Sequence, residues 1–365
     1  MLKILHFADL HLGASFKRFG QKGGKLREGL KHTLANIVKT AQSEGAALVV
    51  IAGDLTDSNK VAPATIDYII RQLNKLDMPV VILPGTHDCL EKSSVFNRQE
   101  WSNLQNVYIF RNENGQTFNF LSLSLAVHGK ANKSNKSTTS PLNGLQADPG
   151  YRWNIAVAHG SLQIKGKSSE EDYPITFDDL ANCDMDYVAL GHWHEYFEHR
   201  SSKTMACYSG SASTMSFSTP DSGTVNLVEL ADEGVTVRRL PVAYHKWFST
   251  DCTLDSLEEV LRENAGPQSL ASLRLDEAFD TAKAALLDEL YSRYSDEYFY
   301  LDIECNRAVD SEVEIDPAAF PENTFAGQFI RLALKAIETA KPEEKPIAKK
   351  VLDEGYKILI TGEVS

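Results

Sequence analysis

The stretch Tyr187–His194 (YVALGHWH) combines the two features on which the interpretation of this chain depends. Its first four residues form a short apolar run with β-branched and aromatic members, which is typical of a buried strand. Gly191 allows a tight turn after that strand, and His192 and His194 follow in the loop. Two imidazoles one residue apart at a rigid strand end suit a divalent metal ion, although two unrelated loop histidines would look the same.

Polar clusters follow other predicted strands in the same way. These strands cover residues 2–8, 46–52, 78–83 and 153–158. Helices predicted at 27–44 and 62–76 separate the first three, and this βαβ order favours a sheet with right-handed crossovers. In such sheets ligands collect at the carboxyl ends of the strands. The candidate metal ligands at those ends are Asp9, His11, Asp54, His87 and His159, which join His192 and His194 in one set.

A mixed set of carboxylates and imidazoles suits manganese, iron or zinc better than calcium. One ion needs about three or four protein ligands, so six or seven candidates suit two ions. A carboxylate shared between the ions would hold them roughly 3.5–4 Å apart.

The remaining segments predict further strands and helices. Residues 107–110, 117–120 and 123–128 alternate in the manner of antiparallel strands, and 204–208 and 224–230 complete the sheets at about residue 243. Later elements are predicted as helices at 254–264, 276–294, 324–339 and 346–360, with a strand at 298–305.

Charge is unevenly distributed along the chain. Residues 241–365 hold 13 Lys and Arg against 25 Asp and Glu, whereas residues 1–240 hold 24 against 25. A protein that binds a polyanion by itself is usually basic. Residues 1–240 are nearly neutral, so they would have to bind a polyanion through local basic patches and metal ions. The basic candidates for DNA contacts are Lys17, Arg18, Lys22, Lys130, Lys133 and Lys136, although such loop cations are more often simply solvated.

Composition also bears on compartment. The 5 cysteines are odd in number and lack C-x-x-C spacing, which argues against a disulfide framework or a zinc–thiolate site. No stretch approaches 18 apolar residues, and the start lacks the layout of a signal peptide. These features predict a cytoplasmic protein that does not enter a membrane.

Five blocks of the chain, taken in order, resemble the pattern of the calcineurin-like metallophosphoesterases. That pattern is D-x-H, G-D-x-x-D, G-N-H-D/E, a lone His and G-H-x-H, each at a strand end. The blocks here are Asp9–His11, Gly53–Asp57, Gly85–Asp88, His159–Gly160 and Gly191–His194. One block is a weak signal, but five in the right order are specific.

The resemblance implies a role for each matching residue. The implied ligands are Asp9, His11 and His194 for a first ion, Asp54 as the bridge, and His159 and His192 for a second. His87 would bind no metal but would face the substrate phosphate as a proton donor or charge stabiliser, oriented by Asp57. Thr86 stands where the family has an Asn ligand. The Thr side chain is shorter than Asn, and its hydroxyl is a poorer metal ligand than an amide carbonyl. The second ion would therefore bind through a water molecule or more loosely.

Within the family the chain is similar to the SbcD branch, the nuclease subunits of double-strand-break repair complexes, including YhaO-like exonucleases. The similarity lies in Ile4–Gly13, in Ala189–His194, and in Tyr208–Ser211 followed by Gly223–Val225. It implies an α/β fold, a four-layered sandwich of two mixed sheets flanked by helices, with a small C-terminal α/β capping domain. The expected domains are 1–245 (nuclease), 246–318 (capping and DNA-binding) and 319–365 (helices that dock an ATPase).

The predicted function is therefore metal-dependent exonuclease activity on DNA in double-strand-break repair, with two ions, Mn²⁺ first and Mg²⁺, Fe²⁺ or Zn²⁺ as alternatives. The expected partners are DNA and an ABC ATPase of the SbcC type, and the sequence leaves a homodimer open. Two rival hypotheses remain. One is a phosphomonoesterase for a small molecule or protein, and the other is a DNA-end-binding subunit with weakened catalysis.

Overall fold

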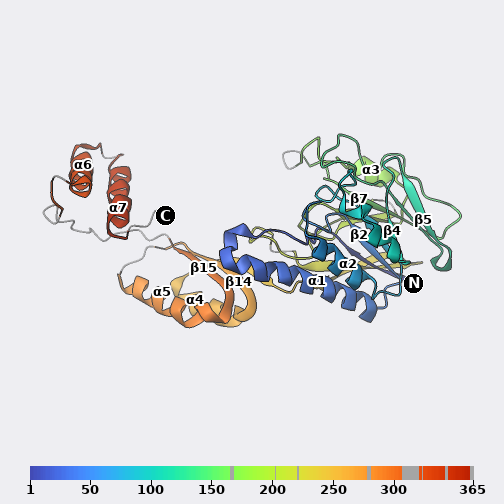
Figure 1. Ribbon diagram of the computed structural model, residues 1–365, viewed down its shortest axis with the longest axis horizontal. Helices are drawn as coiled ribbons and strands as arrows, with labels where there is room; N and C mark the ends of the chain where they lie inside the picture. The colour runs from blue at the N-terminus through green and yellow to red at the C-terminus, as the bar shows by residue number, and fades with distance from the viewer. Residues whose placement is uncertain are drawn as a thin grey trace. The chain divides into compact units, whose positions relative to one another are not determined.

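The computed structural model describes residues 1–164, 168–201, 203–219, 222–277, 281–305, 320–322, 324–341 and 344–361 (Figure 1). The chain forms two compact units. The first contains Met1–Leu275 and Leu290–Glu304, and the second contains Asp276–Glu289 and Cys305–Ser365. All the predicted site residues belong to the first unit.

The first sheet has six strands in the order β12-β11-β1-β2-β3-β4. Its strands are β1 (Leu2–Phe7), β2 (Leu48–Ala52), β3 (Val80–Leu83), β4 (Val107–Ile109), β11 (Thr224–Ala231) and β12 (Gly234–Pro241). Strands β1 to β4 run parallel, and β11 pairs antiparallel with both β1 and β12. Every residue of β2 is buried, as expected for a parallel strand covered on both faces.

Helices α1 (Gly23–Ser43) and α2 (Pro63–Leu73) follow β1 and β2 and pack side by side (Figure 1). Leu26, Leu30 and Leu34 give α1 a buried apolar face at helical spacing. Pro at the start of α2 costs no hydrogen bond, because the first helical N–H groups have no partner within the helix. These helices connect parallel strands, as the βαβ order predicts.

The second sheet has the order β5-β6-β7-β8-β10-β9. Its strands are β5 (Gln116–Phe120), β6 (Leu125–Gly129), β7 (Trp153–His159), β8 (Tyr187–Gly191), β9 (Phe197–Ser201) and β10 (Thr204–Tyr208). The inner four strands run parallel, and β5 and β9 pair antiparallel at the edges. A capping box, formed by Thr176 and Asp179, starts α3 (Phe177–Asn182) before β8.

The two sheets pack against each other. Apolar side chains of both, such as Leu5, Val50, Val157 and Ala189, belong to one buried core, and β2 contacts β7 and β8. In Figure 1, α1 and α3 lie on opposite sides of this unit, with the strands between them. Two mixed sheets with flanking helices confirm the predicted fold class.

One strand orientation was predicted wrongly. The alternation at residues 107–110 indicated an antiparallel strand, but β4 pairs parallel with β3. The chain passes from β3 to β4 through η2 (Val95–Asn97) and η3 (Gln99–Asn103). Val107 and Tyr108 are only half-buried because β4 ends the sheet. The alternating pattern reflects one solvated face, which says nothing about strand direction. Antiparallel pairing is confirmed for β5 and β6, which η4 (Leu121–Leu123) joins.

A third sheet has the order β13-β14-β15. Its strands are β13 (Lys246–Cys252), β14 (Gly266–Leu275) and β15 (Tyr298–Cys305), joined through α4 (Leu254–Asn264), α5 (Thr281–Tyr294) and η5 (Ser295–Glu297). The sequence predicted α4, α5 and β15 but not β13 or β14. The domain boundaries at 245 and 318 stay a prediction, and residue 318 lies outside the described ranges.

The two predicted terminal helices, α6 (Phe325–Thr339) and α7 (Lys345–Thr361), are present in the second unit, and they pack on each other. Ile330, Ala333 and Leu352 are buried between them. Within the described ranges, no helix combines the length and apolarity needed to cross a membrane.

Candidate metal centre

The predicted ligands lie where parallel strands of both sheets end. The turns after β1 and β2 are tied together, because the Asp9 amide donates to the Gly53 carbonyl (3.1 Å) and the His11 amide to the Asp54 carbonyl (3.0 Å). Asp9, His11 and Asp54 have φ values near +50°, a backbone conformation that residues other than glycine rarely adopt. Such strained backbone persists only where the surrounding structure imposes it, and it clusters at functional sites.

Two glycines let the strand ends approach closely. A Cβ at Gly53, whose φ is +95°, would lie 2.2 Å from Nδ1 of His159. A Cβ at Gly191 would lie 1.9 Å from the Ala52 carbonyl oxygen. The glycines of the second and fifth sequence blocks therefore let the imidazole of His159 sit between the two sheets.

Asp9, His11 and His194 form the first group of candidate ligands, with ligand atoms within 4.8 Å of one another. The Nε2 atoms of the two histidines are 3.1 Å apart. Oδ2 of Asp9 accepts a hydrogen bond from the His192 amide at 2.9 Å, whereas its Oδ1 is buried and has no hydrogen-bond partner in the described part of the chain. An unpartnered buried carboxylate oxygen fits a bound cation.

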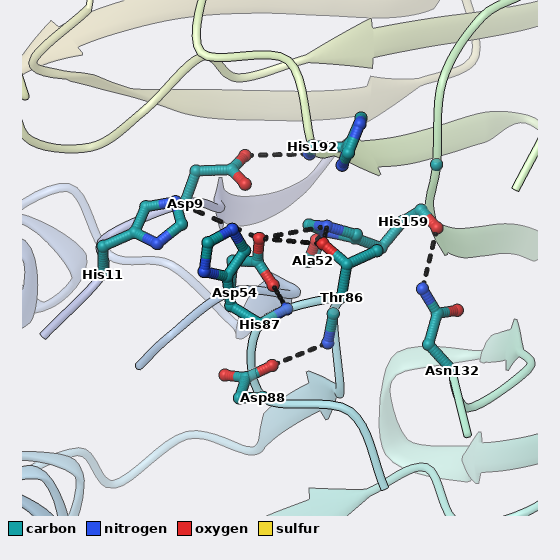
Figure 2. A network of polar contacts seen from close by, with 12 residues as sticks. Asp9, His11, Ala52, Asp54, Thr86, His87, Asp88, Asn132, His159 and His192 are labelled. Atoms are coloured by element: carbon teal, nitrogen blue, oxygen red, sulfur yellow. Dashed lines mark hydrogen bonds and ion pairs between the residues drawn. The ribbon is translucent and has the colours of Figure 1, made fainter. Parts of the chain in front are cut away.

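Asp9, Asp54 and His159 form the second group (Figure 2). Nδ1 of His159 donates to the Ala52 carbonyl at 2.8 Å, which directs Nε2 toward Asp54, 3.3 Å from Oδ2. Asp54 is 2% exposed and Asp9 is fully buried. Two carboxylates buried together require positive charge nearby.

The pKa values of Asp54 and His159 show that the buried carboxylates need positive charge nearby. Burial alone favours the neutral form of each group, but their mutual attraction is stronger. Against burial, the charge of His159 lowers the pKa of Asp54 well below its usual range. Against burial, the charge of Asp54 raises the pKa of His159 to about 10. A divalent ion at this place would supply the positive charge instead.

The Thr86 hydroxyl lies in this second group. Its Oγ1 is 3.3 Å from Oδ2 of Asp54 and 3.4 Å from Nε2 of His159. The structure therefore places Thr86 beside the Asp54 carboxylate, where the resemblance implies the second ion.

His87 and Asp57 lie on the solvent side of the first group. The exposed His87 ring is 4.7 Å from that of His11, and its Nδ1 contacts the backbone carbonyl of Asp57 at 3.0 Å. The Asp57 carboxylate instead faces His11, with Oδ1 3.5 Å from Nδ1. Asp57 thus holds the His87 ring through its main chain rather than through the predicted carboxylate contact.

The sequence analysis assigned no role to two buried residues that shape this site. Asp88 accepts hydrogen bonds from the Gly85 amide (2.7 Å) and the Thr56 amide (3.0 Å), and so joins the turns after β2 and β3. Burial, together with the charge of Asp54, raises the pKa of Asp88 to about 6. Asn132 donates to the His159 carbonyl at 3.1 Å (Figure 2). Asp88 ends the third block and could have been noticed, whereas nothing local marks Asn132.

The two sets of predicted DNA-binding cations lie in different surroundings. In η1 (Lys17–Lys22), the Arg18 guanidinium lies over the rings of Phe19 (4.8 Å) and Trp247 (5.7 Å), and Nζ of Lys22 donates to the Phe299 carbonyl. These contacts join η1 to the third sheet rather than to the ligand cluster.

The second set adjoins the ligands. A cleft of about 680 Å³ is lined by Thr86, His87, His192, Lys60 and Lys133, among others. A neighbouring pocket of about 280 Å³ is lined by Lys130, Lys133 and Lys136 together with several hydroxyls. Because Lys133 lines both hollows, the cleft and the pocket are adjacent.

A sequence model described as calcineurin-like phosphoesterase matches residues 2–196, which contain all the strand-end groups described above. The chain belongs to this family. The predicted calcineurin-like resemblance is thereby confirmed, as is the predicted class of metal-dependent phosphoesterase. Family membership implies divalent metal ions, and the buried carboxylates and imidazoles fit them.

Two relatives are named as the D subunit of the nuclease SbcCD. That of Staphylococcus epidermidis is 28% identical over 242 residues, which is 60% of this chain and 63% of the relative. That of Staphylococcus saprophyticus is 27% identical over 267 residues, which is 66% of this chain and 69% of the relative. The chain therefore matches less than two thirds of the first relative's length. The solved structure of TT1561 from Thermus thermophilus aligns with 65% of this chain and 98% of its own, at 12% identity and a TM-score of 0.41.

Proposed function

We propose that this chain is a two-metal phosphodiesterase that degrades DNA as the nuclease subunit of a repair complex. The observation that carries the proposal is a cleft in which His87 and Lys133 lie with Thr86 and His192, because the Thr86 hydroxyl adjoins the buried ligands Asp54 and His159. The names of the two relatives support a nuclease. Manganese suits the donor set, although iron or zinc would suit it as well.

The first ion would be held by Asp9, His11 and His194, and Asp54 would face both ions. The second would be held by His159 and His192, with Thr86 beside it. When bound, the ions lower the pKa of water toward 7 and neutralise phosphate oxygens. Contacts with neighbouring backbone already orient several of these side chains, so little reorganisation is needed.

His87 is the candidate proton donor. Its Nδ1–H is engaged by the Asp57 carbonyl, so Nε2 is the nitrogen that can carry a proton to the leaving oxygen. Its amide donates to Oδ1 of Asp54 at 2.8 Å, which fixes the residue beside the ligands.

Lys133 favours a polymeric substrate. A phosphodiester in the cleft would place its neighbouring phosphate near the pocket formed by Lys130, Lys133 and Lys136. A pocket lined mainly by lysines and hydroxyl or amide side chains suits phosphates better than bases. A monoester would leave that pocket unused.

The function is tested by comparing nucleotide release from duplex DNA with hydrolysis of nitrophenyl phosphate, both with Mn²⁺. The proposal requires DNA to be the better substrate by kcat/KM. A preference for the monoester would favour a phosphomonoesterase. Absence of hydrolysis with two ions bound would favour a DNA-end-binding subunit.

A prediction concerns the second ion. Because the Thr86 hydroxyl reaches less far than an amide, we expect Thr86→Asn to raise Mn²⁺ affinity at the second position and turnover at limiting metal. Calorimetric titration of both forms measures it. Equal affinities would show that the hydroxyl, directly or through water, already serves as well as an amide.

We also propose that the α6–α7 pair docks an SbcC-type ATPase. Phe325, Leu332, Ile347 and Val351 are more than half exposed, although the opposite sides of these helices are buried. The relatives are named as subunits, which implies a partner. An exposed apolar face on a helix pair is suited to packing against another helical protein.

We predict that Leu332→Glu combined with Val351→Glu abolishes co-purification with the ATPase, because buried charge at an interface is costly. Hydrolysis of a small diester should stay unchanged. Lys335→Glu, also exposed on α6, is the matched control and should retain the complex. If the double variant still co-purified, the ATPase would have to bind elsewhere.

A further inference from the structure

Asp172 lies beside the proposed second ion position and belongs to none of the five sequence blocks. Its backbone is pinned between two loops. Its carbonyl accepts from the Ser161 amide at 3.0 Å, and the next amide, that of Tyr173, donates to the Ser137 carbonyl at 2.9 Å. Its side chain lines the same cleft as Thr86 and His192. Backbone hydrogen bonds therefore hold Asp172 at the edge of the cleft.

The Asp172 carboxylate contacts one nitrogen of His192. Its Oδ2 is 2.7 Å from Nε2, a short distance typical of a strong hydrogen bond to a charged acceptor. Since a carboxylate only accepts, Nε2 carries the proton, and neutral His192 keeps its lone pair on Nδ1. The contact therefore selects the nitrogen that is left for an ion.

His192 needs such support. Its φ of 112° is unfavourable for a residue with a side chain. Its amide is held by Oδ2 of Asp9, and its ring meets that of His159 edge-on at 5.2 Å. These contacts set the position of the backbone and one side of the ring. Among the residues that the structure describes, only the Asp172 contact distinguishes the two ring nitrogens.

We propose that Asp172 is a positioning residue that fixes the orientation and tautomer of His192 for the second metal ion. The inference rests on the proposed two-metal function and deepens it. Thr86 offers a shorter ligand than the family's Asn, so the second position depends more on its imidazoles. Carboxylates that orient a metal-bound histidine typically contribute about 10–100-fold in metal affinity.

The test is a calorimetric Mn²⁺ titration of the full chain and two variants. Asp172→Ala removes the acceptor, and we expect second-ion affinity to fall about 10–100-fold while the first ion binds as before. Asp172→Asn keeps an acceptor oxygen and should recover most of that loss. Glu171→Gln is the control, because this neighbouring carboxylate pairs with Lys136 instead, and it should leave both affinities unchanged.

A second readout needs no metal. In ¹⁵N NMR spectra of the metal-free protein, His192 should show protonated Nε2 and unprotonated Nδ1, and Asp172→Ala should populate both tautomers. Unchanged tautomer or unchanged second-ion affinity in Asp172→Ala would overturn the inference. A second-ion affinity as low in Asp172→Asn as in Asp172→Ala would also overturn it. The Asp172 carboxylate would then act on the ion through its charge, as a ligand does, and not as a hydrogen-bond acceptor for His192.

The outcomes separate this inference from the function on which it rests. If the wild-type chain bound one ion only, the two-metal proposal and the role of Asp172 would both fail. If it bound two ions and cleaved DNA while Asp172→Ala bound both normally, only the role of Asp172 would fail.

Discussion

His87→Gln is expected to bind both ions and DNA almost normally, yet to lose most nuclease turnover. The exposed ring forms a candidate group with His11 and Asp57 but belongs to neither buried group, so removing it leaves Asp9, Asp54 and His159 in place. The amide bond to Asp54 comes from the backbone and survives the substitution. Gln keeps the size and a hydrogen-bond donor but cannot release a proton, and a general acid is worth roughly 10²–10⁴ in rate.

The measurements are metal content, DNA affinity and the Mn²⁺-dependent exonuclease rate. His192→Gln should by contrast weaken the second ion as well. His32→Gln makes the same substitution on the exposed face of α1 and should behave as wild type. If His87→Gln lost metal in step with activity, His87 would be a ligand. Full activity would mean that another group donates the proton.

Asp54→Asn is expected to lose metal at both positions. The Asp54 carboxylate lies 4.0 Å from Nε2 of His11 and 3.3 Å from Nε2 of His159, so it reaches toward both groups of candidate ligands. Replacing it by a neutral amide removes the charge shared between them, and the loss should exceed the roughly 10–100-fold effect of an outer carboxylate. Mn²⁺ titration and exonuclease assay would measure it.

The same variant reports on charge in the metal-free protein. In the wild type the attraction of Asp54 raises the pKa of His159 despite burial. Without that charge, less opposes the lowering of the His159 pKa by burial, so this pKa should fall. NMR titration of the metal-free forms measures the shift. Asp178→Asn, an exposed change on α3, should leave both metal binding and this pKa unaltered; an unshifted pKa in Asp54→Asn would contradict the ion pair.

The sequence alone determined the family, the βα order and which strand ends carry the candidate ligands. The reason is that both signals are local. A continuous apolar run such as Leu48–Ala52 marks a buried parallel strand, and the polar residues directly after it must lie at its carboxyl end. Five such ends in order were enough to predict that Asp9, Asp54 and His159 meet.

Only the tertiary structure decided how those ends face each other. The contact between Asp172 and His192 spans 20 positions, and that between the His192 amide and Asp9 spans 183. Neither leaves a pattern in nearby residues, because the partner is chosen by how two sheets and their loops pack. The direction of β4 and the turn of the Asp57 carboxylate toward His11 were likewise set by neighbours distant in sequence. Local periodicity reports whether a face is buried, and it is silent about what buries it.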